Sequence, residues 1–399
     1  MSKRCVGTVV RGLRAPIVKE GDDIVKIVVD SVLEASECEG FSLRDRDVIG
    51  ITESLVARAQ GNYINIDDIV DDINNKFDGD EIAVMFPILS RNRFAVILES
   101  IAKTKKTIHL FLNYPSDEVG NHLMDVDKMD ELGVDPYADL LTEEKYRELF
   151  GQEVKHPFTD IDYVKMYREI GIDGNIKIYL TNRAEDALKY TDQILVANIH
   201  ERYRTKRKLK AAGAKLIYGL DDLITEPIDG KGYNEEFGLL GSNRATDNTV
   251  KLFPRDCDTV VKKIQEEIKE RTNKRVEVMV YGDGAFKDPV GKIWELADPI
   301  VSPGFTDGLI GTPNEIKLKY IADNELNDAD SSEVMELMKK KIRENKDLTS
   351  STDEKTRLGT TPRQLTDLLG SLFDLTSGSG DKGTPIVLVQ GYFDSLATE

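Results

Sequence analysis

In the first third of the chain, apolar side chains alternate between the spacing typical of helices and the short runs typical of buried strands. After Gly21-Asp22-Asp23, apolar residues recur every three or four positions, which is the spacing of a helix with one buried face. Short uninterrupted apolar runs elsewhere have the length of buried strands. On this basis we expect strands at 5–10, 47–52 and 107–112, and helices at 24–33, 53–60, 66–77 and 94–104.

The middle of the chain has a different character. Residues 128–171 are acidic and helical in propensity. Next comes a strand–helix–strand–helix–strand series, which is typical of a small parallel α/β unit. The elements of this series are expected at 176–180, 184–190, 193–199, 201–212 and 215–220.

The last third returns to longer helices followed by apolar strands. We expect helices at 259–272 and 364–375, strands at 275–281 and 385–390, and a Ser/Thr-rich loop at 348–352. The whole pattern predicts a mixed α+β fold in three parts. These parts are an N-terminal part at 1–121, an inserted α/β subdomain at 122–235 and a C-terminal part at 236–399.

Composition narrows the class of protein. The chain has 399 residues, is 40% hydrophobic and carries a formal net charge of −18, which disfavours nucleic acid as a partner. Three widely spaced cysteines, no signal-peptide pattern and no apolar run of about 18 residues predict a cytoplasmic protein without a membrane span. The one basic run, at 202–210, is interpreted as the solvated face of a helix.

A glycine-rich loop at 377–385 precedes the last predicted strand. Its glycines allow backbone N–H groups to turn toward an anion, and Lys382 adds a positive charge. The loop lacks the P-loop pattern GxxxxGK[ST] and precedes a strand instead of a helix. A flexible connector is the alternative interpretation.

Two other segments place polar residues directly after predicted strands. Asp283 follows an apolar strand between two glycines, where a carboxylate can bind a hard cation, although a turn aspartate is equally compatible. Lys287 follows in the same loop. In the N-terminal part, Arg14 and Arg58 could reach phosphates, and Ser54 could donate from a helix start.

Other chemistries lack their usual marks. The four histidines show no metal-ligand spacing, so a zinc site is not expected. The sequence has no GxSxG, HExxH or GxGxxG motif, which argues against nucleophilic hydrolases and Rossmann dehydrogenases.

Four segments, in this order along the chain, resemble the γ-glutamyl ligase family of the deazaflavin coenzyme F(420). They are GLRAPI with KEGDD (12–23), DVIGITESLVARAQG (47–61), LFPRDCD to KRVEVMVYGDG (252–284) and SGSGDKGTPIVLVQG (377–391). The resemblance covers 1–121 and 236–399. It implies a homodimer and a reaction in which a nucleotide, GTP or ATP, activates a small-molecule carboxylate as an acyl phosphate for attack by L-glutamate.

The resemblance also implies roles for particular residues. It places Asp283 and Lys287 in the catalytic site. It implies a metal site for Mg²⁺ or Mn²⁺ at Asp283 and Asp117. The residues expected to bind the nucleotide are Gly12, Arg14, Ser54, Arg58, Asn243, Gly380, Asp381, Lys382 and Gly383.

The sequence departs from the family pattern in one metal-binding segment, which has two candidate counterparts. Residues 237–243 fit the neighbouring sequence but carry Leu240 at the position of the metal aspartate, whereas 113–121 keep the Asn-to-Asp spacing. Two other functions therefore stay open. One is a ligase of the same mechanism acting on another carboxylate and amine, and the other is an inactive nucleotide- or metabolite-binding homologue. We expect 122–235 to govern the choice of acceptor, with dimerisation or stabilisation as the alternative.

Overall fold

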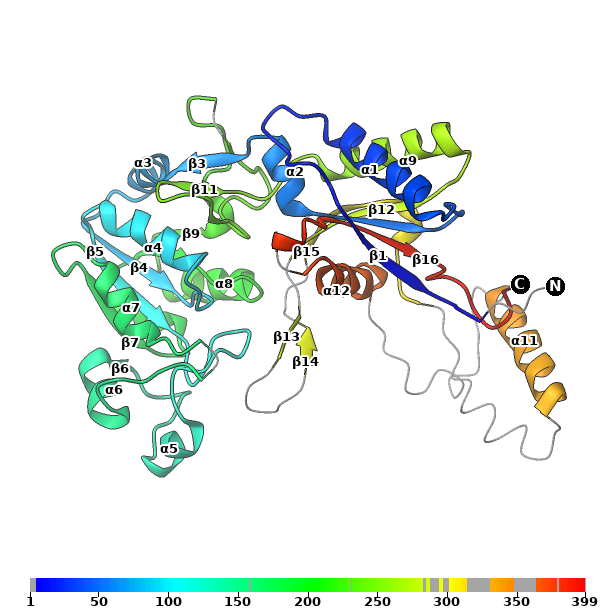
Figure 1. Ribbon diagram of the computed structural model, residues 1–399. Helices are drawn as coiled ribbons and strands as arrows, with labels where there is room; N and C mark the ends of the chain where they lie inside the picture. The colour runs from blue at the N-terminus through cyan, green and yellow to red at the C-terminus, as the bar shows by residue number, and fades with distance from the viewer. Residues whose placement is uncertain are drawn as a thin grey trace. The chain divides into compact units, whose positions relative to one another are not determined.

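The computed structural model describes residues 5–157, 159–230, 232–282, 285–287, 294–296, 301–313, 331–347, 364–378 and 380–398. The chain forms two compact units (Figure 1). The first unit combines Met1–Val56, Asp256–Phe286 and Leu296–Glu399. The second unit combines Ala57–Arg255 and Lys287–Glu295. The first unit is therefore discontinuous in sequence, and each unit has its own main sheet.

The sheet of the first unit has five strands in the order β1-β16-β2-β12-β15. Strands β2 and β12 run parallel, and the other neighbours are antiparallel. Strands β16, β2 and β12 are buried along nearly their whole length, as expected for strands covered on both faces. The strands are Val9–Leu13 (β1), Ile386–Gln390 (β16), Val48–Thr52 (β2), Glu277–Gly282 (β12) and Val301–Phe305 (β15).

Helices cover both faces of this sheet (Figure 1). Helices α1 (Ile24–Glu39) and α9 (Cys257–Thr272) contact each other, and α12 (Leu365–Ser377) packs on the opposite face. Asp23 caps α1 by accepting a hydrogen bond of 3.1 Å from the N–H of Lys26. The other described elements of the first unit are η3 (Asp307–Leu309), α11 (Ser331–Asp347) and η5 (Gly380–Lys382). Helix α2 (Glu53–Ala59) and the paired strands β13 (Ala285–Lys287) and β14 (Trp294–Leu296) each contain residues assigned to both units.

The second unit contains a six-stranded sheet in the order β6-β7-β5-β4-β8-β9. The strands β7, β5, β4, β8 and β9 are parallel to one another, and the short β6 is antiparallel to its neighbour β7. Within this sheet, the chain first forms the inner strand β4 and then adds β5 and β7 on one side of it. It then returns to the other side of β4 for β8 and β9, so the strand order reverses between β4 and β8. The strands are Glu81–Met85 (β4), Thr107–Leu112 (β5), Leu141–Thr142 (β6), Ile176–Leu180 (β7), Gln193–Val196 (β8) and Leu216–Gly219 (β9).

Separate apolar cores lie on the two faces of the second sheet. Along β4, Ile82 and Val84 belong to the larger core, whereas Ala83 and Met85 belong to the smaller one. This alternation follows from the two-residue period of a strand. The larger core includes residues of α3 (Ile66–Lys76), α4 (Phe94–Lys103) and α7 (Tyr163–Ile170), and the smaller one includes residues of η1 (Ala184–Lys189) and α8 (Arg202–Ala212).

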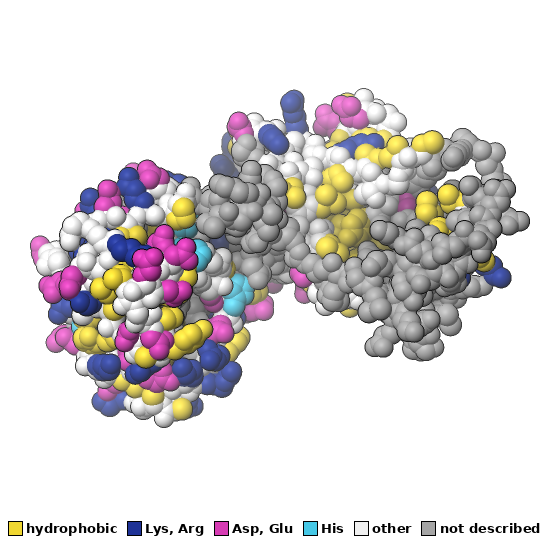
Figure 2. All heavy atoms as spheres, turned by 90° about the horizontal axis from the view of Figure 1, so that it is seen from below, with side chains coloured by type: hydrophobic (Ala, Val, Ile, Leu, Met, Phe, Trp, Pro, Cys, Tyr) yellow, Lys and Arg dark blue, Asp and Glu magenta, His cyan; other side chains and the backbone are white. Residues whose placement is uncertain are grey.

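The remaining elements of the second unit are short. They are α5 (Val126–Glu131), α6 (Glu143–Phe150), η2 (Leu220–Asp222) and a small sheet of β3 (Tyr63–Asn65), β11 (Thr249–Lys251) and β10 (Asn243–Arg244). Helix α8 carries the basic run, and its cations pair with acids: Arg202 and Lys206 contact Asp221, and Lys208 contacts Glu185. On the part of the second unit visible in Figure 2, basic and acidic side chains are intermingled. The basic run therefore belongs to a mixed, solvated surface.

Mixed sheets and helices confirm the predicted α+β class. The strands predicted at 107–112 and 176–180 match β5 and β7 at both ends. The strand predicted at 5–10 was wrong by several residues, because pairing with β16 places β1 at Val9–Leu13. The predicted loop at 348–352 lies outside the described residues.

The boundaries of the compact units differ from those expected from sequence. Residue 122 falls inside the second unit, because β4 and β5 share one sheet with β7, β8 and β9. The continuous part of this unit spans Ala57–Arg255 instead of 122–235. Strand β4 was not predicted, and without it the sheet could not be assembled from the sequence.

Candidate functional site

Four segments of the first unit meet at one edge of its sheet. Leu13, at the end of β1, pairs with Ile386, at the start of β16. Ile386 also pairs with Ile51 near the end of β2, and Thr52 pairs with Tyr281 near the end of β12. The segments that follow β1 and β2, the C-terminal end of β12 and the loop that precedes β16 therefore share this edge, which we call the loop edge.

The glycine-rich loop and the segment after β1 are in direct contact. The N–H of Ala15 donates to the carbonyl of Gly383 over 3.3 Å. A Cβ added to Gly12 would lie 3.2 Å from Cβ of Thr384, so a side chain at residue 12 would press on the loop. Thr384 in turn donates from Oγ1 to the carbonyl of Ser377 over 3.1 Å, which joins the two ends of the loop.

Two of the residues predicted to bind the nucleotide, Arg14 and Lys382, belong to the loop edge. Both carry a positive charge, and both are exposed. A Cβ added to Gly378 would lie 2.6 Å from Nζ of Lys382, so the lysine side chain lies over the loop's own backbone. Gly378 and Gly383 have φ values of 60° and 66°, in the left-handed region that favours glycine. The arrangement gives the edge positive charge and a sharply turned backbone, which suits an anion.

The segment after β2 adds a buried carboxylate that was not among the predicted site residues. The N–H of Thr52 donates to the carbonyl of Pro385 over 3.1 Å, and Glu53 follows with 7% of its surface exposed. Ser54 donates from Oγ to Oε1 of Glu53 over 3.0 Å. A Cβ added to Gly282 would lie 2.9 Å from Cγ of Glu53. Glu53 therefore contacts the residue that immediately precedes Asp283.

In the sequence, only the position of Glu53 directly after a predicted strand indicated that it could belong to the site. Asp283 lies outside the described residues, as does the side chain of Lys287, whose backbone belongs to β13. Among the residues whose side chains are described, no three His, Cys, Asp or Glu residues are grouped to hold a metal ion.

Burial keeps two nearby groups protonated. It raises the pKa of the Tyr281 hydroxyl to about 12, although the nearby Ser377 hydroxyl opposes the shift, and the charge of Asp374 raises the pKa further. It also raises the pKa of the Cys257 thiol to about 12, with help from nearby carboxylates. Since the thiolate is the reactive form of cysteine, Cys257 is a packing residue and not a nucleophile.

Three other predicted site residues belong to the second unit. Arg58 is exposed on α2, and Asn243 pairs with Lys251 between β10 and β11. Asp117 is only 6% exposed. It accepts hydrogen bonds of 2.8 to 3.0 Å from the N–H groups of Leu89, Val119 and Asn121, and one of 2.7 Å from Nδ2 of Asn121.

These four donors occupy both carboxylate oxygens of Asp117. Burial raises the pKa of Asp117 even though the hydrogen bonds oppose the shift. The residue ties the loop after β5 to the loop after β4, which favours a structural role over metal binding.

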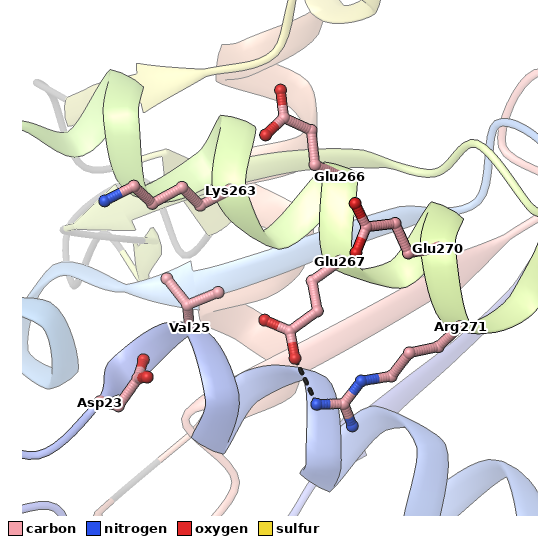
Figure 3. Close-up of a pocket in the computed structure, with 7 residues that line it drawn as sticks. All are labelled: Asp23, Val25, Lys263, Glu266, Glu267, Glu270 and Arg271. Atoms are coloured by element: carbon pink, nitrogen blue, oxygen red, sulfur yellow. Dashed lines mark hydrogen bonds and ion pairs between the residues drawn. The ribbon is translucent and has the colours of Figure 1, made fainter.

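A groove of the first unit lies between α1 and α9 (Figure 3). None of the predicted site residues lines it. Its lining carries four carboxylates and two cations, and one of those cations, Arg271, is paired with Glu267. Excess negative charge makes this groove a poor place for a phosphate group.

A family model described as F(420)-0:gamma-glutamyl ligase matches residues 12–391, which is nearly the whole chain. The chain therefore belongs to the F(420)-0:gamma-glutamyl ligase family, whose members are ligases that form carbon–nitrogen bonds. No curated protein matches the chain. None of the helices in the described part of the chain is long and apolar enough to cross a bilayer.

Proposed function

We propose that the chain joins L-glutamate to a small-molecule carboxylate, F(420)-0 or a relative of it, through an acyl phosphate formed from GTP or ATP. Membership of the ligase family supports the reaction class. The observation that carries the nucleotide assignment is the loop edge, where the segments after β1 and β2 and the loop before β16 converge.

The loop edge suits a triphosphate for a simple electrostatic reason. A carboxylate is a poor acyl donor, and phosphorylation activates it only if the phosphate charge is offset. Lys382 and Arg14 supply cations, and the turned backbone at Gly383 helps to shape the loop around an anion. The family resemblance also assigns Arg58 and Asn243 to nucleotide binding.

A divalent cation, Mg²⁺ or Mn²⁺, would supply charge that offsets the negative charge of the phosphates. We assign its binding to Asp283, with Glu53 as the second carboxylate because Glu53 contacts Gly282. Hard cations prefer oxygen ligands of this kind. Asp117 is not needed for this assignment, since hydrogen bonds already occupy its oxygens.

Calorimetry with GTP and ATP, each with and without Mg²⁺, tests the nucleotide assignment. Lys382→Ala should weaken binding about tenfold, because a hydrogen bond to a charged group contributes about 1.5 kcal/mol or more. Lys269→Ala is the matched control, since Lys269 is an exposed lysine of α9. Absence of heat from both nucleotides at millimolar concentration would sink the ligase proposal.

The second candidate is a ligase that acts on another carboxylate. The observation that favours it is the second unit, whose parallel sheet extends to both sides of β4. Nucleotide-dependent phosphate release that needs glutamate but does not respond to F(420)-0 would identify it. Nucleotide binding with no phosphate release for any carboxylate would instead indicate an inactive binding homologue. The family resemblance also suggests a homodimer, which sedimentation of the intact chain would test.

A further inference from the structure

The second unit has a cavity at the point where its strand order reverses. In open α/β sheets, ligands bind beyond the carboxyl ends of the strands at this position. The cavity begins in the loop after β4, at Ile88 and Ser90, and continues in the loop after β8, at Ala197 and Ile199. Segments of α4, η2 and 239–242 complete its walls.

Carboxylates from the loop after β5 hold both of these loops. Asp117 accepts from the N–H of Leu89 over 2.8 Å. Glu118 accepts from the N–H groups of His200 and Glu201 over 3.0 and 3.3 Å. These are hydrogen bonds to charged groups, which are stronger than neutral ones. The two walls are therefore fixed in place before any ligand arrives.

One polar side chain in the cavity wall is unsatisfied. Ser242 is 2% exposed, and its Oγ has no hydrogen-bond partner among the described residues. The turn that carries it is anchored, because the N–H of Leu239 donates to the carbonyl of Leu220 over 2.8 Å. A buried hydroxyl without a partner is costly. Its Oγ is closed off from solvent, so a ligand atom would recover the lost hydrogen bond when the Ser242 side chain turns toward the cavity.

The remaining lining favours a neutral, apolar ligand. Ile88, Phe94, Ile97, Ile199 and neighbouring leucines supply most of the wall, and the cavity measures about 50 Å³. The first N–H groups of α4 do not await an anion, because those of Phe94 and Ala95 donate to Ser90. Arg93 also lines the cavity, but it already has an interaction partner within the chain.

We infer that the second unit is a binding module for a neutral organic ligand. The ligand inserts a small branched aliphatic end between the loops after β4 and β8 and hydrogen-bonds to Ser242. This function goes beyond the ligase reaction and does not depend on it. The site recognises an apolar end of roughly isopropyl size together with one adjacent hydrogen-bonding atom.

Methyl NMR of the full chain, with isoleucine δ1 methyls labelled and no nucleotide present, tests the inference. Isobutyramide is the probe, since it combines an isopropyl group with one amide. It should shift the methyl signals of Ile88, Ile97 and Ile199 saturably, while those of Ile73 and Ile108, buried elsewhere in the unit, stay unchanged. Acetamide, which lacks two carbons of the tip, should bind about tenfold more weakly.

Three variants separate the contributions. Ser242→Ala should weaken isobutyramide binding about three- to tenfold. Ala197→Leu should abolish the saturable shifts by filling the cavity. Ser100→Ala is the matched control, because Ser100 is equally buried but already donates to the carbonyl of Val96 over 3.1 Å. Shifts that do not saturate, or affinities equal in wild type and Ser242→Ala, would overturn the inference whatever the ligase assays give.

Discussion

At the scale of single residues, two buried carboxylates differ in what surrounds them. Asp117 is enclosed by four hydrogen-bond donors from loops of the second unit. Glu53 lies at the end of a strand, against the glycine that precedes Asp283. Sequence spacing favoured Asp117 as a metal ligand because it preserved an Asn-to-Asp distance. Spacing alone could not reveal that backbone N–H groups occupy its oxygens.

Asp283→Asn should reduce metal-dependent phosphate release by about a hundredfold or more, because an amide lacks the charge that a hard cation requires. Glu53→Gln should weaken the apparent affinity for Mg²⁺ in the same assay. Asp307→Asn serves as control, since Asp307 is exposed in the same unit. Turnover by Asp283→Asn at the wild-type rate would show that Asp283 is only a turn residue.

A buried histidine of the second unit makes stability depend on pH. Burial lowers the pKa of His109, although the charge of Glu81, 3.5 Å away, opposes the shift. A histidine with a folded pKa below its unfolded value of about 6.5 binds fewer protons when folded. Below that pH the unfolded state takes up more protons, so the free energy of unfolding falls as the pH drops.

His109→Phe should therefore flatten the loss of thermal stability between about pH 7 and pH 5. Unfolding midpoints measured across this range for the variant and for wild type provide the comparison. His200→Phe is the matched control, because its side chain is exposed. Equal slopes for His109→Phe and wild type would contradict the assignment.

At the scale of elements, β2 holds the first unit together, since it pairs with β16 on one side and β12 on the other. Its central residue, Gly50, lies beneath the ring of Phe373 in α12. A Cβ added to Gly50 would come within 2.4 Å of that ring. The glycine is therefore required by the close approach of α12 to the sheet.

Gly50→Ala should destabilise the chain by about 1–3 kcal/mol, the usual cost of overpacking a core. Adding Phe373→Leu should restore part of the loss by making room for the new methyl group. Denaturant unfolding measures both effects, and Gly7→Ala, where the added Cβ meets nothing within 4 Å, is the control. A Gly50→Ala variant as stable as wild type would show that α12 packs less closely than described.

Local patterns predicted many elements well and their assembly less well. Helix α1 was predictable because Asp23 caps a helix with a regular apolar stripe. Strand β5 was predictable because its apolar run has clear ends. Strand β4 was missed although it lies at the centre of the second sheet, because its position depends on pairing with β5 and β8, which are distant in sequence.

At the scale of the whole molecule, the chain forms two compact units with separate cores. The order of motifs along the sequence predicted the ligase family, and the family match over 12–391 confirms it. The motifs could not show that all four of them reach one sheet edge, since that arrangement arises only when β1, β2, β12 and β16 pair. The loop edge is therefore the structural basis of the proposed activity.

Hydrogen–deuterium exchange of the intact chain, with and without GTP and Mg²⁺, tests the role of the loop edge most directly. Bound nucleotide should slow exchange of the backbone amides in peptides spanning residues 11–16 and 378–386, because ordering the loop suppresses local opening. Peptides from α1 and α9, which line the acidic groove, should exchange at unchanged rates. Protection confined to that groove, or none at 11–16 and 378–386 under saturating nucleotide, would contradict the account.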